Sequence, residues 1–126
     1  MPKTEVRAFR EADGSVPLQD WLDALEVSEP KPYAKCLARI LELAERGNEM
    51  RRPHADLLRD GIYELRAPFG GVQYRILYFF FAKNAAALSH GIVKERKVPD
   101  AEIDLAVRRK RLVERDVDRH TADFEV

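Results

Sequence analysis

Apolar positions in the first half of the chain follow a helical period. They recur at i, i+3, i+4 and i+7 in residues 16–26 and again in residues 32–47, which predicts two amphipathic helices. Pro17 suits the first turn of the earlier helix, and Gly47 suits the C-terminal cap of the later one. A short β-prone stretch, residues 4–10, comes before them. This half therefore predicts a strand followed by a helical hairpin.

The period changes to two after residue 60. Residues 61–68, 72–81 and 85–95 alternate or are continuously apolar, and the turns between them are short enough for antiparallel hairpins. Residues 48–60 are polar and predict a long connection with room for one helical turn. We therefore expect three consecutive strands in the second half.

The last periodic segment, residues 98–120, predicts a helix that Pro99 and Asp100 open. A frayed tail is expected from about Thr121. The predicted order is β-α-α-β-β-β-α, an α+β fold with a small antiparallel sheet. The N-terminal helical hairpin covers one face of this sheet, and the C-terminal helix packs elsewhere.

Composition supports one ordinary globular domain spanning residues 1–126. The chain is 45% hydrophobic and 35% charged. Its longest apolar run, residues 76–82, has the length of a strand, and its first residues are polar. Cys36, the single cysteine, lies on an apolar helical stripe and is expected to be a buried, inert thiol. These features predict a cytoplasmic protein without a membrane span.

The formal net charge of zero hides an asymmetry. Residues 51–111 carry 13 basic and 7 acidic side chains, whereas the segments on either side are each acidic by three charges. A basic middle segment is suited to contact phosphates. The alternative is a solvated face whose acidic partners come from the two ends of the chain.

Two arginines stand out in the apolar hairpin, one on each side of Gly70-Gly71. If residues 68–71 form a four-residue loop, Arg66 pairs with Gln73, and Arg75 lies diagonally opposite on the same face. Any loop with an even number of residues gives this shared face. Two like charges side by side repel, so either Glu64 or acids of the last helix neutralise them, or they form an anion site.

Further basic side chains follow at the end of the third strand: His90, Lys94, Arg96 and Lys97. Together with the two arginines they predict a cleft that handles phosphate. A hydrogen-bonded structural role is the alternative for His90. The histidines are scattered and the cysteine is alone, so we expect no metal and no cofactor.

Four motifs in series, over roughly residues 57–110, resemble the HigB-type, phage-derived branch of the RelE/ParE toxin superfamily. They are L-x-D-G-I-Y-E-L-R, Y-R-I-L-Y-F, L-S-H-G-I-V-K and V-P-x-x-E-I-x-x-A. The resemblance implies a RelE-like fold and a ribosome-dependent endoribonuclease that cleaves mRNA and so inhibits translation. The partners it implies are the ribosome, mRNA and a small antitoxin, often a helix-turn-helix DNA-binding protein.

By position in the motifs, the resemblance implies a catalytic role for Arg66, Arg75 and Lys94. Metal-free RNA cleavage requires cations around the pentacovalent phosphate, a role that suits the arginines, and groups that move protons, a role for Lys94 or His90. The remaining basic residues are expected to contact RNA backbone: Arg59, Arg96, Lys97, Arg108, Arg109, Lys110 and Arg111.

Two alternatives stay open on the same fold. One is a ParE-like toxin that inhibits a gyrase-type target without catalysis. The other is a degenerate toxin that acts as an interaction protein, since Glu95 stands where many relatives carry a second lysine. Fold alone does not decide among these functions.

Overall fold

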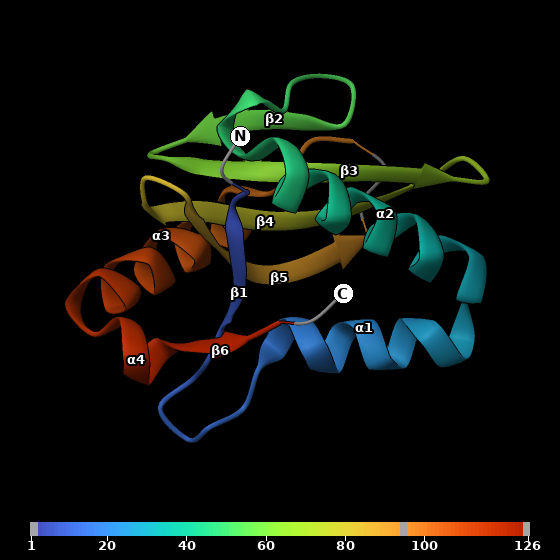
Figure 1. The fold of residues 1–126 in the computed structure, drawn as a ribbon. Helices are drawn as coiled ribbons and strands as arrows, with labels where there is room; N and C mark the ends of the chain where they lie inside the picture. The colour runs from blue at the N-terminus through green and yellow to red at the C-terminus, as the bar shows by residue number, and fades with distance from the viewer. Residues whose placement is uncertain (1–2, 94–95, 125–126) are drawn as a thin grey trace.

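The structure is a computed structural model that describes residues 3–93 and 96–124. The described residues form one six-stranded sheet with helices on both faces (Figure 1). The strands are β1 (Glu5–Phe9), β2 (Ala55–Arg59), β3 (Ile62–Phe69), β4 (Val72–Ala82), β5 (Ala85–Val93) and β6 (Thr121–Asp123). The helices are α1 (Pro17–Ser28), α2 (Pro30–Arg46), α3 (Asp100–Arg115) and α4 (Val117–His120), and a 3-10 turn spans Gly47–Glu49.

The helical hairpin covers one face of the sheet, as predicted. Leu18 and Leu22 of α1 and Ile40 of α2 are buried against β-strand side chains such as Ile76 and Tyr78. Burial of these apolar stripes stabilises the hairpin, because neither short helix is stable alone.

The C-terminal helix α3 packs on the opposite face. Its Ile103 and Ala106 join a second core with Leu77 and Phe79 of β4 and Ile92 of β5. Alternate residues of β4 thus serve two cores, which explains why this strand is apolar on both faces. None of the helices in the described part of the chain is long and apolar enough to cross a membrane.

The turn between β3 and β4 has two residues, Gly70 and Gly71, not the four considered from the sequence. Both have positive φ, 59° and 81°, as a tight hairpin of this length requires. The resulting register places Arg66 directly opposite Arg75. The prediction that both arginines share one face is therefore confirmed, although they face each other directly and not diagonally.

The sheet has two strands that the sequence pattern did not reveal. β2 lies within the predicted polar connection and pairs with β3 at one edge of the sheet. β6 pairs antiparallel with β1, where Arg7 Nη1 donates to Asp123 Oδ1 at 2.6 Å. The expected fraying from Thr121 is therefore wrong for residues 121–123, because this pairing holds them.

Two further predictions need correction. The helix expected through residue 120 ends at Arg115, since Asp116 is extended (φ −156°, ψ 90°) and its side chain accepts from Arg119 N to cap α4. The sheet is mostly but not wholly antiparallel, because β1 pairs parallel with β5. The strand predicted over residues 85–95 is present as β5 through Val93, and residues 94–95 lie outside the described residues.

Candidate functional site

The two arginines share a buried carboxylate. Glu64, only 1% exposed, lies on the same face of β3 and receives both side chains. Its Oε1 accepts from Arg75 Nη1 at 2.7 Å, and its Oε2 accepts from Arg66 Nε and Nη2 at 3.2 and 3.1 Å. Glu64 therefore neutralises the two arginines, which was one of the alternatives considered from the sequence. Its negative charge allows the two guanidinium groups to lie side by side.

A second carboxylate, Asp56 of β2, binds Arg66 but not Arg75. Its Oδ2 accepts from Arg66 Nη2 at 3.2 Å and from Arg52 Nη2 at 2.9 Å. The Arg52 hydrogen bond, together with the positive charges of Arg52 and Arg66, lowers the pKa of Asp56 below its ordinary value. Asp56 is therefore ionised at neutral pH.

The two arginines differ in what they can reach. The side chain of Arg75 is 10% exposed, and its Nη2 donates to the Arg96 carbonyl. It therefore fastens the segment after β5 to the sheet. The side chain of Arg66 is 27% exposed and faces solvent, so it is the member of the pair that a ligand can meet.

A cleft of about 380 Å³ opens beside this network. It lies on the α3 face of the sheet and extends from β2, β3 and β4 to the segment before α3 and the first turns of that helix. Five basic and three acidic residues are among the described residues that line it. The cleft is lined by Asp56, Leu58, Arg59, Glu64, Arg66, Arg75, Arg96, Lys97, Val98, Asp100 and Ile103.

Arg59 contributes less free charge to the cleft than the sequence suggested. Its guanidinium donates to Asp104 at 2.7 Å and to Asp60 at 2.8 Å, and it lies 3.7 Å from Asp100. These acids balance its charge. Arg96 and Lys97 line the cleft as predicted for a basic site.

His90 is not part of the cleft lining. It is buried on β5, with Nδ1 2.7 Å from Ser89 Oγ and Nε2 3.3 Å from Glu102 Oε1. Burial, reinforced by the positive charge of Arg109, lowers its pKa. This arrangement supports the structural alternative for His90, in which it connects β5 to α3. Lys94, the other proton-transfer candidate, lies outside the described residues.

The basic run of α3 points in several directions. Arg108 and Arg111 are exposed, and Lys110 is half-buried and pairs with Glu114 at 3.0 Å. Arg109 is buried: its Nη1 donates to the Ser89 carbonyl at 3.1 Å, and its guanidinium lies 4.9 Å from the centre of the Phe9 ring. Its interior place does not fit the expected contact with RNA backbone, because that contact needs a solvent-facing guanidinium.

The sequence profile of the phage-derived Gp49-like proteins (DUF891) matches residues 20–111. The chain belongs to this family. The matched part runs from α1 into the basic run of α3 and contains the residues that line the cleft. A search among curated proteins found no match. Membership of the Gp49-like family is consistent with a toxin of a toxin–antitoxin system in general.

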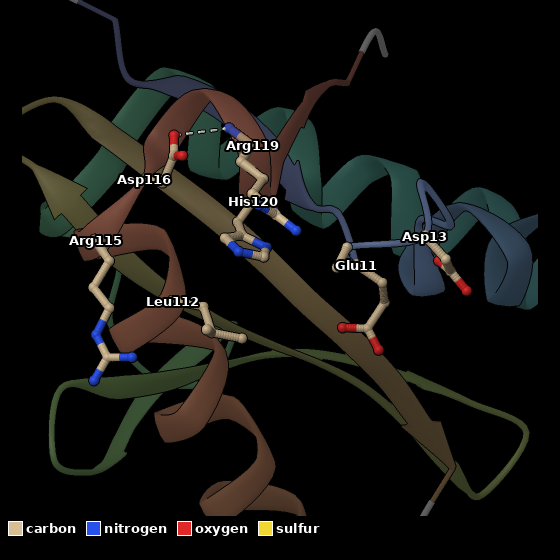
Figure 2. A pocket seen from close by; sticks show the side chains of 8 residues that line it. Glu11, Asp13, Leu112, Arg115, Asp116, Arg119 and His120 are labelled. Carbon is tan, nitrogen blue, oxygen red and sulfur yellow. Dashed lines mark hydrogen bonds between the residues drawn. The ribbon is translucent and has the colours of Figure 1, made fainter.

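This Gp49-like protein has a larger cavity, of about 670 Å³, between the loop after β1 and the corner joining α3 to α4 (Figure 2). Its lining carries acids and arginines in nearly equal number, so it offers little net attraction for an anion. Neither Arg66 nor Arg75 lines it. The cavity is lined by Glu11, Ala12, Asp13, Leu112, Arg115, Asp116, Arg119 and His120.

Sequence reasoning missed Asp56 as a cleft residue. Its segment was expected to be a polar connection, so no strand face was assigned to it. The available signal was the short stretch Ala55–Arg59, in which the acid precedes two leucines. Cys36 is buried as predicted, and burial raises its thiol pKa to about 12, which leaves it unreactive.

Proposed function

We propose that this Gp49-like protein is the toxin of a type II toxin–antitoxin system and cuts mRNA on the translating ribosome. The observation that carries the proposal is the cleft, where the solvent-facing Arg66 lies with Arg96 and Lys97. The RelE-like arrangement implied by the sequence motifs is part of the proposal. An antitoxin, in this proposal a helix-turn-helix protein, restrains the activity in the cytoplasm.

The chemistry proposed is metal-independent transesterification. The 2′-OH of the RNA loses its proton and attacks the neighbouring phosphorus, and the 5′-oxygen leaves with a proton. Arg66 stabilises the charge of the pentacovalent phosphate, since fixed cations aimed at developing charge supply the larger part of such catalysis. Arg75 supports this by holding the segment that carries Arg96 and Lys97.

Proton transfer in this proposal belongs to a lysine of the segment after β5. Lys97 lines the cleft, and Lys94 is the residue that the sequence motif points to. A lysine ammonium in the cleft can donate a proton to the leaving 5′-oxygen. His90 is the weaker candidate, because its ring nitrogens face Ser89 and Glu102.

Expression without the antitoxin tests the proposal. The protein should arrest growth, and primer extension should show cuts in a translated reporter mRNA. The same reporter without a start codon is the matched control and should stay whole, because a domain this small relies on the ribosome to orient its substrate. A chelator that leaves ribosomes intact should not stop the cutting.

Two results would contradict the proposal. Equal cutting of the translated and the untranslated reporter would show that cleavage does not depend on the ribosome. Intact mRNA together with stalled replication would favour an inhibitor of a gyrase-type target.

A further inference from the structure

Asp56 lies beside Arg66 in the cleft. It belongs to the edge strand β2, and its side chain is 23% exposed beside the 27% exposed Arg66. Both residues line the same cleft. Arg66 already uses Nη2 for Asp56, at 3.2 Å, and Nε and Nη2 for Glu64. An anion that binds Arg66 through Nη2 therefore competes with a carboxylate of the protein itself.

The two carboxylates are not equally easy to displace. Glu64 is 1% exposed and also holds Arg75, so moving it away from Arg66 disturbs a buried network. Asp56 is more exposed and has a second partner, Arg52, at 2.9 Å. If Arg66 turns away, Asp56 stays paired with Arg52, and no carboxylate is left without a cation.

We infer that Asp56 is an internal competitor for Arg66 that sets the affinity of the cleft for phosphate groups. A phosphodiester takes the place of Asp56 on Arg66, and Asp56 remains on Arg52. That the phosphodiester belongs to RNA rests on the proposed function. The competition itself needs only the cleft and the two side chains.

Removal of the Asp56 charge should strengthen binding. Asp56→Asn keeps the shape and the ability to accept hydrogen bonds, but it removes one negative charge from the neighbourhood of the bound phosphate. Coulomb interaction across a solvated cleft predicts a gain in affinity of about three- to tenfold at low salt. The gain should shrink as salt is added.

The experiment measures binding of a short 2′-O-methylated oligoribonucleotide, which cannot be cut, to the purified chain by fluorescence anisotropy. The matched control is Asp23→Asn, the same change at an exposed position on α1. Asp56→Asn should bind more tightly than the parent, and Asp23→Asn should bind equally. In an Arg66→Ala background, Asp56→Asn should bring only a small gain.

Three outcomes overturn the inference: Asp56→Asn binds no more tightly than Asp23→Asn, the full gain persists without Arg66, or the parent binds no better than Arg66→Ala. Thermal melts check folding, and Asp56→Ser replaces Asp56→Asn if the latter is unfolded. The outcome is separable from the proposed function. A protein that cuts no mRNA but shows the Asp56 effect keeps this inference, and one that cuts without the effect loses it.

Discussion

At the scale of single residues, two arginines that look equivalent in the hairpin have different environments. Arg66 and Arg75 face each other across β3 and β4 and share Glu64. They differ in burial. Arg75 is enclosed and donates to the Arg96 carbonyl, whereas Arg66 is more exposed and lines the cleft. The buried carboxylate makes this division possible, because it balances a charge that could not otherwise be enclosed.

Arg66→Ala should abolish cutting while the protein stays folded. Loss of one donor to a developing oxyanion typically costs on the order of 2.7–4 kcal/mol of transition-state stabilisation, which is about a hundred- to a thousandfold in rate. Primer extension on the reporter mRNA, together with a thermal melt, measures both properties. Arg115→Ala, which removes an exposed arginine at the end of α3 that is not assigned to RNA contact, is the control and should still cut. Undiminished cutting by Arg66→Ala, or loss of its fold, would show that Arg66 is structural.

Glu64→Ala should destabilise the fold strongly. It leaves Arg75, 10% exposed, without its carboxylate partner, and breaking a buried ion pair costs about 3–5 kcal/mol. Urea unfolding measures the loss. The control is Glu5→Ala, which removes a 60% exposed partner of Arg7 and should change stability by no more than about 0.5 kcal/mol. Similar unfolding curves for the two variants would contradict the role given to Glu64.

Among the helices and strands, the sequence predicted those that have a clear hydrophobic periodicity. The stripes of α1 and α2 and the alternation in β3 and β4 depend on local spacing, so these elements appear where they were expected. β2 and β6 are short and lie at the sheet edges, where neighbouring strands supply the pairing. Strands this short leave only a weak local pattern, such as the two leucines after Asp56 in β2. For the same reason Asp56 could not be assigned to the cleft.

Gly91 connects two elements by close approach. A Cβ added there would lie 2.3 Å from atoms of the Trp21 ring, so β5 and α1 could not keep their separation. Gly91→Ala should therefore destabilise the protein by about 1–3 kcal/mol, the usual cost of overpacking. Thermal or urea unfolding measures this. In the double variant with Trp21→Leu the loss should be smaller than the sum of the single losses. Strict additivity would show that the ring does not limit this contact.

Across the whole molecule the formal net charge is zero, but basic and acidic side chains are unevenly distributed. The basic excess of residues 51–111 is partly offset by acids from outside this segment that the fold brings close, such as Glu114 against Lys110 and Glu11 against Arg109. What remains is divided between the cleft, with Arg96 and Lys97, and the solvent face of α3, with Arg108 and Arg111. These two surfaces could not be separated from the sequence, because it could not show that Arg109, between the exposed residues, points inward.

The separation predicts two different salt dependences. Lys97→Ala should reduce the slope of log K against log salt for a short single-stranded RNA by about 0.7, the value for one phosphate contact. Arg108→Ala should leave that slope unchanged, since Arg108 lies outside the cleft lining. For association with whole ribosomes, Arg108→Ala should reduce the salt slope, because the exposed side chain of Arg108 can contact ribosomal RNA. Oligonucleotide titrations and ribosome sedimentation at several salt concentrations measure the two slopes.

If Arg108→Ala and Lys97→Ala changed both slopes equally, the cleft and the α3 face would act as one RNA-binding surface, and the division of charge proposed for the molecule would be wrong.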